Sequence, residues 1–241
     1  MTAPALTARL AAEVRAKGYA IWPEFLSPAR CAALRDLAQA LAESEHANHY
    51  PGSTRVWDLF RHGQPFTDLL TDPCLSALLN SLLGEHHLLS DFSLNVVHPG
   101  QPVDNWHIDY PYNEMPSPVT GSILGLQCVL ALDQFHEGNG ATQLVPGSDN
   151  PPRNPDPQAI DQQVVFCAEP GTLLVMAAAT WHRSGVNASG ARRSAALLSF
   201  VERWVRPMSD PPEPGPWTST DALRTLLGTQ RPPDTINGVP V

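Results

Sequence analysis

A histidine and an aspartate stand two positions apart in the stretch WHIDY, residues 106–110. Successive side chains of a strand point to opposite faces, so on a strand His107 and Asp109 project from the same face. An imidazole and a carboxylate placed in this way can bind one metal ion. The alternative is two ordinary polar residues near a strand end, because a single histidine on a strand more often has a structural role.

A metal ion needs at least a third ligand, and His182 is the best candidate. It ends the apolar run TLLVMAAATWH, 73 residues after Asp109. Two histidines and one carboxylate form the facial triad of non-haem Fe(II) oxygenases, which leaves coordination positions free for an oxo-acid and dioxygen. Zinc and nickel bind such ligands at least as tightly, so these residues alone leave the metal open.

An arginine eleven residues after His182 supplies a second signal. We expect a hairpin turn through SGVNASGA to bring Arg193 back alongside the strand of His182. A buried guanidinium is costly unless it meets an anion, and its fork of donors pairs best with a carboxylate. The pattern favours a dicarboxylate cosubstrate such as 2-oxoglutarate. Arg192 competes for this role, because the following run SAALLSF is apolar on both faces and strand parity does not choose between them.

The elements that must position these residues fall into two groups. Helical spacing and capping residues predict helices over 5–17, from Ser27 onward and from Asp72 to Gly84, with an extended segment at 19–26. From residue 88 the chain changes to short runs rich in Leu, Val and Phe, separated by Pro-Gly turns. The gaps are too short for crossover helices, which indicates an antiparallel core.

We therefore expect a mainly β fold, a double-stranded β-helix (a cupin-like jelly roll) with N-terminal flanking helices. We expect the 241 residues to form one domain. Its parts are a mostly helical flank over 1–87, the jelly-roll core over 88–206, and an irregular C-terminal segment over 207–241 with a short helix near 220–227.

The composition excludes some classes of function. The net charge of −9 and the absence of a basic cluster argue against nucleic-acid binding. No apolar run is long enough to cross a membrane, and the N-terminus does not read as a secretory signal, so the expected location is the cytoplasm. The four cysteines form no CxxC pair, as expected of reduced thiols. The expected partner is a small-molecule substrate, and the oligomeric state is left open.

Three further stretches carry a family resemblance: LALDQFHEGNGATQLVPGSD (130–149), HRSGVN followed by ARR (182–193), and GYAIWPEFLSPARCAALR near the N-terminus. Together with His107-x-Asp109 they resemble the phytanoyl-CoA dioxygenase family of Fe(II)/2-oxoglutarate oxygenases. The resemblance implies Fe(II), 2-oxoglutarate and O2 as cofactors. It favours Arg193 over Arg192 and adds Ser184 and Gln127 as contacts to 2-oxoglutarate. Phytanoyl-CoA itself is not carried over as the substrate.

Several other residues are candidates for substrate binding. Tyr110 and Tyr112 follow the expected metal strand, and Trp106 precedes it; each could equally pack the core or the rim. Arg55 is either a substrate contact or a buried salt-bridge partner. Long loops at 110–121 and 147–163 are candidate binding loops or lids.

These observations predict a 2-oxoglutarate-dependent non-haem iron dioxygenase of the hydroxylase type, acting on a small metabolite in a specialised biosynthetic or catabolic pathway. No catalytic residue is expected beyond the metal ligands. One alternative is a zinc or nickel enzyme of cupin-like build, a hydrolase or isomerase that does not use 2-oxoglutarate. A second is a non-catalytic member that binds a ligand or a partner.

Overall fold

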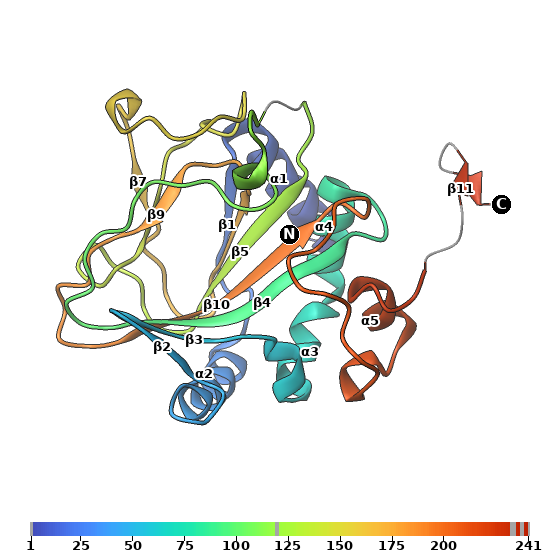
Figure 1. The fold of residues 1–241 in the computed structure, drawn as a ribbon, viewed down its shortest axis with the longest axis horizontal. Coiled ribbons are helices and arrows are strands. Elements are labelled where there is room, and N and C mark those ends of the chain that lie inside the picture. Colours follow the sequence, from blue (N-terminus) through green and yellow to red (C-terminus); the bar gives the residue numbers. More distant parts are fainter. Residues whose placement is uncertain (1, 119–120, 232–234, 237–238, 241) are drawn as a thin grey trace.

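The structure is a computed structural model, which describes residues 2–118, 121–231, 235–236 and 239–240. Its strands are β1 (Tyr19–Trp22), β2 (Asn48–Tyr50), β3 (Ser53–Val56), β4 (Leu88–Val97), β5 (Gly125–Ala131), β6 (Thr142–Leu144), β7 (Val164–Val165), β8 (Leu173–Ala177), β9 (His182–Ser184), β10 (Arg193–Val201), β11 (Thr235–Ile236) and β12 (Val239–Pro240). A large sheet has the order β1-β8-β5-β10-β4-β3-β2, and a small one has the order β7-β6-β9. All of their pairings are antiparallel, and β11 and β12 form a separate hairpin. This arrangement confirms the predicted jelly roll (Figure 1).

Helices flank the large sheet. They are α1 (Ala3–Lys17), α2 (Pro28–Ala42), α3 (Gln64–Leu70), α4 (Pro73–Leu83) and α5 (Asp221–Leu226), with short 3-10 turns η1 (Leu59–His62), η2 (Tyr112–Glu114), η3 (Pro157–Ala159) and η4 (Pro216–Thr218). The expected caps form: the side chains of Ser27, Asp72 and Thr220 accept backbone N–H groups at the starts of α2, α4 and α5. Gly18 ends α1 in the left-handed conformation that glycine adopts without a steric penalty. No helix in the described residues is long and apolar enough to cross a membrane.

The two faces of the large sheet have different chemistry. Along β4, alternate residues Phe92, Leu94 and Val96 belong to the main apolar core, which also contains buried residues of α1, α2 and α4. Burying each such side chain stabilises the fold by about 2 kcal/mol. The residues between them turn to the other face, toward the small sheet, and several of these are polar. The helices therefore cover one face of the sheet, and the opposite face can line a site.

The structure corrects two local expectations. Residues 48–56 form the β2–β3 hairpin, which extends the large sheet at β4, so the N-terminal flank is less helical than predicted. Strands β9 and β10 do not pair with each other, because β9 belongs to the small sheet and β10 to the large one. The turn between them crosses from one sheet to the other and is held by Asn187, whose side chain donates to the carbonyls of Val97 and Ala191.

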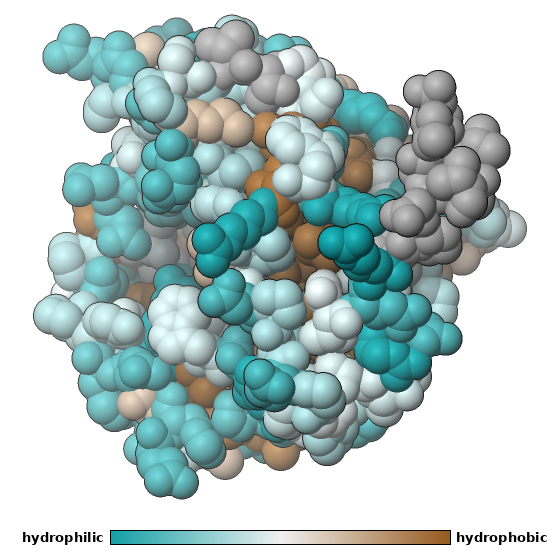
Figure 2. Space-filling model, turned by 45° about the vertical axis from the view of Figure 1, so that its right-hand side comes forward, coloured by the Kyte–Doolittle hydropathy of each residue, from teal (hydrophilic) through white to brown (hydrophobic). Residues whose placement is uncertain are grey.

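The face seen in Figure 2 is mostly hydrophilic, with apolar side chains visible mainly in its recesses. A few large apolar residues are exposed; Trp204, for example, is 71% exposed. Exposed apolar residues are normal on a protein surface.

Candidate metal centre and its cavity

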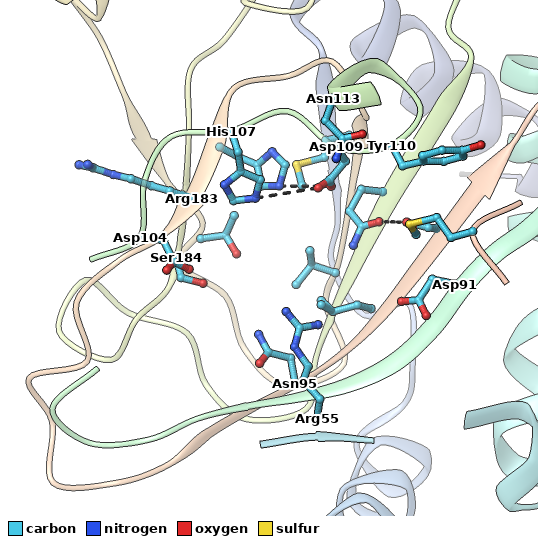
Figure 3. A pocket seen from close by; sticks show the side chains of 18 of the residues that line it. Arg55, Asp91, Asn95, Asp104, His107, Asp109, Tyr110, Asn113, Arg183 and Ser184 are labelled. Atoms are coloured by element: carbon cyan, nitrogen blue, oxygen red, sulfur yellow. Dashed lines mark hydrogen bonds and ion pairs between the residues drawn. The ribbon is translucent and has the colours of Figure 1, made fainter. Parts of the chain in front are cut away.

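His107, Asp109 and His182 come together at one end of the space between the two sheets. One ligand atom from each lies within 4.8 Å of the others, and among the described residues no other group of three His, Cys, Asp or Glu side chains gathers in this way. Nε2 of His182 lies 3.3 Å from Oδ2 of Asp109, and Nε2 of His107 lies 3.9 Å from Oδ1. The three residues that the sequence selected therefore face a common point (Figure 3).

The backbone explains how the two histidines meet. The N–H of each donates to the carbonyl of the other at 3.0 Å, an isolated bridge between His107 and His182. The N–H of Asp109 donates to the carbonyl of Ala178 at 2.7 Å. The expectation that His107 and Asp109 lie on a regular strand was wrong, because Pro102 and Pro111, which have no N–H, flank a segment that makes only one bridge. The segment remains extended enough to keep both side chains on one side.

The histidine rings are already oriented for coordination. Nδ1 of His107 lies 2.9 Å from the carbonyl of Asn105, and Nδ1 of His182 lies 2.9 Å from the carbonyl of Thr180. A carbonyl can only accept a hydrogen bond, so in the neutral rings Nδ1 carries the proton and Nε2 keeps a free lone pair. Backbone carbonyls orient metal-binding histidines in this same way.

The electrostatics of the triad also suit a cation. Burial alone would raise the pKa of Asp109, but His182 and His107 outweigh it and the pKa is lowered. Burial would lower the pKa of His182, but Asp109 outweighs it and the pKa is raised. Oδ2 of Asp109 is buried and has no well-formed hydrogen bond. A buried carboxylate oxygen with two imidazole nitrogens beside it matches the donor set of a divalent metal.

Arg193 is buried in the same cavity, at 2% exposure. One of its NH2 groups donates to the carbonyl of Gly140, and the guanidinium lies 4.3 Å from the ring centroid of Phe135. Its Nε has no hydrogen-bond partner. Burial lowers the pKa of Arg193 to about 10, so the group is still charged at neutral pH. A charged, buried donor fork with an unused N–H is a site for an anion.

Ser184 and Gln127 line the cavity as well. Ser184 is two residues after His182 on β9. Gln127 lies on β5 and is buried; its Oε1 accepts a hydrogen bond from the hydroxyl of Ser199, which leaves its amide N–H groups for another acceptor. The structure thus brings together the metal triad and all three residues expected to contact 2-oxoglutarate.

The tentative substrate residues divide into two pairs. Tyr110 and Arg55 line the cavity. Trp106 is not among the residues that line it, but lies beside it, with the guanidinium of Arg183 at 4.3 Å from its ring. Tyr112 is 1% exposed, and its hydroxyl bonds to the backbone of Ser122 and Leu124, so it lies in the core next to a different cavity.

The cavity has a volume of about 250 Å³ and contains polar residues that the sequence reading did not assign to it. Asp91 and Asn95 point into it from β4, opposite the triad (Figure 3). Asn95 pairs in register with Arg55 on β3, and Asp91 pairs with Ser199 on β10. The signal was present in the sequence: Asp91, Ser93 and Asn95 alternate with apolar residues, as expected of one polar face on a buried strand.

Other histidines do not form a competing site. His87 is buried, with Nδ1 3.3 Å from the carbonyl of Gly84 and its ring against Phe200. Nε2 of His98 lies 2.9 Å from the hydroxyl of Thr54. Among the described residues, no group of possible metal ligands forms from His86, His87, Asp91 and His98, although they are close in sequence.

Comparison with known proteins decides the family. Residues 14–195 match the family model described as phytanoyl-CoA dioxygenase. The chain belongs to the phytanoyl-CoA dioxygenase family. Membership confirms the resemblance inferred from the motifs. It also confirms, at the level of the family, the predicted class of 2-oxoglutarate-dependent non-haem iron dioxygenases and its cofactors.

Several curated relatives are dioxygenases from fungi. The chain is 29% identical over 216 residues to "Dioxygenase af480" of Aspergillus fumigatus, covering 83% of this chain and 68% of that protein. It is 31% identical over 186 residues to "Dioxygenase trt7" of Aspergillus terreus, covering 73% of this chain and 60% of that protein. The chain thus spans about two thirds or less of the length of these relatives.

Solved structures share the fold at low sequence identity. The "non-heme alpha ketoglutarate dependent epimerase SnoN from nogalamycin biosynthesis" superposes with a TM-score of 0.70 at 21% identity, covering 99% of this chain and 96% of that one. "EctD from S. alaskensis with bound Fe" gives a TM-score of 0.68 at 20% identity, covering 81% and 76%. The jelly roll of this phytanoyl-CoA dioxygenase family member is therefore the fold of known iron enzymes.

Proposed function

We propose that the chain is an Fe(II)/2-oxoglutarate-dependent oxygenase that hydroxylates or otherwise oxidises a small metabolite in a specialised biosynthetic or catabolic pathway. The observation that carries the proposal is one cavity that holds both a pre-oriented His-Asp-His triad and a buried guanidinium with an unused N–H. A metal hydrolase needs the first of these features but not the second.

Each residue then has a separate task. His107, Asp109 and His182 would hold Fe(II) through their Nε2 and carboxylate oxygen atoms. Arg193 would bind the distal carboxylate of 2-oxoglutarate, with Ser184 and Gln127 as further donors; the burial of Arg193 and Gln127 keeps water from competing for it. Bound iron, 2-oxoglutarate and O2 supply the oxidation of 2-oxoglutarate to succinate and CO2 and the removal of a hydrogen from the substrate.

The remaining walls of the cavity would orient the substrate. Tyr110 lies in the loop directly after Asp109, and Arg55 lies on β3. Asp91 and Asn95 lie on β4. Holding the substrate at a fixed distance from the metal turns an encounter into an intramolecular step, which is the main contribution that a protein makes to such chemistry. A cavity of about 250 Å³ suits a small molecule or one end of a larger one.

The deciding experiment is the addition of Fe(II) and then 2-oxoglutarate without oxygen. We expect a visible charge-transfer absorption that is absent in His107→Ala and needs more 2-oxoglutarate in Arg193→Ala. Succinate should form when oxygen is admitted. A protein that shows no absorption and forms no succinate, but hydrolyses esters or amides with zinc, would instead support the hydrolase alternative.

A further inference from the structure

Asp91 presents a carboxylate to the cavity from the wall opposite the triad (Figure 3). It lies on β4, in register with Ser199 of β10, and Ser199 in turn pairs with Gln127 of β5. Asp91 is therefore one strand beyond β10, the strand that carries Arg193, and Trp57 and Met208 also line the cavity. At this position Asp91 would contact the substrate rather than 2-oxoglutarate.

The fold does not neutralise this carboxylate. The hydroxyl of Ser93 donates to Oδ2 of Asp91 at 2.8 Å. Among the ion pairs of the described residues, none joins Asp91 to a Lys, Arg or His nitrogen within 4.0 Å. Arg55 acts on it only from a distance. Burial raises the pKa of Asp91 to about 6, even though Ser93 and Arg55 oppose the shift.

Among the other charged residues of the cavity, Arg55 lies with its guanidinium 5.8 Å from the ring centroid of Trp57 and forms no ion pair within 4.0 Å in the described residues. Arg193 faces the cosubstrate, and the guanidinium of Arg183 stacks on Trp106 and donates to Gln143, outside the space between Asp91 and the metal. Asp104 also lines the cavity but is exposed to solvent. Asp91 is thus the carboxylate of the inner wall that a bound molecule would have to satisfy.

Resting on the proposed function, we propose that Asp91 recognises a protonated amine of the substrate, so that the enzyme oxidises an amine-bearing small molecule. An ammonium group forms a charge-assisted hydrogen bond with a carboxylate, about twice as strong as a neutral one. The ring of Trp57, 43% exposed, lines the same cavity; the guanidinium of Arg55 lies 5.8 Å from its centroid, so this ring already has a cation beside it. A neutral hydroxyl group would leave the buried charge uncompensated, and a substrate carboxylate would be repelled.

The test compares three probes of one shape, benzylamine, benzyl alcohol and benzoate. Each is titrated calorimetrically, without oxygen, into the enzyme loaded with Fe(II) and 2-oxoglutarate. We expect benzylamine to bind at least about tenfold more tightly than benzyl alcohol. Asp91→Asn, which keeps the shape and can still accept from Ser93, should abolish the preference, and Asp91→Glu should retain part of it. Asp104→Asn is the matched control and should keep the full preference.

The outcomes separate this inference from the proposed function. No benzylamine binding at millimolar concentration, equal binding of amine and alcohol, or an unchanged preference in Asp91→Asn would overturn the role of Asp91. So would a preference lost in Asp104→Asn instead, or tighter binding of benzoate. If the wild-type protein fails to bind 2-oxoglutarate at all, the proposed function falls. Normal 2-oxoglutarate binding without an amine preference removes only this inference.

Discussion

Arg192 and Arg193 are adjacent in the chain, but their guanidinium groups lie in opposite environments. The side chain of Arg192 is 56% exposed and pairs with Glu43 on the surface, whereas Arg193 is buried above Phe135 in the metal cavity. Strand alternation separates the two side chains, and the start of β10 at Arg193 sets which one faces inward. A swap in register by one residue would exchange their roles.

The first prediction follows from that difference. Arg193→Lys keeps the charge but loses the planar donor fork, so we expect 2-oxoglutarate to bind about 2 kcal/mol more weakly, roughly thirtyfold. Arg192→Lys is the matched control and should bind 2-oxoglutarate as the wild type does. The measurement is the anaerobic titration of the charge-transfer absorption. Equal losses in the two variants would contradict the assignment.

A second prediction concerns the metal ligands. His182→Ala removes one of two imidazoles and leaves Asp109 buried beside a void, so we expect at least about a hundredfold loss of Fe(II) affinity. His136→Ala, at an exposed histidine outside the cavity, should leave the affinity unchanged. Competition with a chromogenic chelator measures both constants. Retention of Fe(II) by His182→Ala would rule out this residue as a ligand.

The third prediction is the pH dependence of metal binding. The pKa of His182 is raised in the metal-free protein, so a proton occupies the ring at higher pH than in an ordinary histidine. A metal must displace that proton, and its affinity therefore falls as the pH falls through the raised pKa. Proton release on binding, measured in two buffers of different ionisation enthalpy, should be largest just below that pKa. An affinity that rises on acidification would contradict the role of His182.

The sequence predicted the site better than it predicted the elements around the site. His107, Asp109, His182 and Arg193 were selected because a metal and a dicarboxylate require particular residue types, and the structure places all four at one cavity. The strand expected at 106–110 was wrong, because a single bridge keeps His107 and Asp109 on one side as a regular strand would. The β9–β10 hairpin was wrong, because a turn that crosses between the sheets also fits the spacing of these residues. Spacing along the chain does not distinguish two neighbouring strands from two strands in facing sheets.

Long-range placement limited the rest of the prediction. No role was predicted for Asp91 from its neighbours in the sequence. Its true neighbours, Ser199 and the cavity, are set by the pairing of β4 with β10. Tyr112 was grouped with Tyr110 because both follow Asp109, but the turn η2 sends Tyr112 into the core. Proximity in sequence misled in both cases, because a strand or a turn directs adjacent side chains apart.

A fourth prediction concerns the loop that follows Asp109. The hydroxyl of Tyr110 donates to the carbonyl of Arg206 and ties this loop to the C-terminal segment beside the cavity. Tyr110→Phe removes one hydrogen bond, worth about 1 kcal/mol, and we expect faster hydrogen exchange at residues 206–210. Met208, whose N–H donates to the hydroxyl of Ser90, should report the change. Unaltered exchange in this segment would show that the tie does not hold it.

The last prediction tests the cost of keeping Asp91 ionised. Its pKa is about 6 in the folded protein against a reference value of 3.8, so the unfolded chain releases this proton more readily than the folded one. A carboxyl group whose pKa is raised by folding stabilises the folded protein when the pH is below its pKa in the unfolded chain. This stabilisation is lost as the pH rises through its pKa in the folded protein. Wild-type protein should therefore lose stability relative to Asp91→Asn between about pH 4 and pH 7.

The expected difference is about 1–2 kcal/mol once solvent in the cavity is allowed for. Urea unfolding of both proteins at several pH values measures it, and the titration of the metal triad cancels in the comparison. A stability difference that does not vary with pH would show that Asp91 is not held ionised at a cost. A difference that grows toward neutral pH would mean that this carboxylate destabilises the ligand-free enzyme, as expected of a group retained for binding.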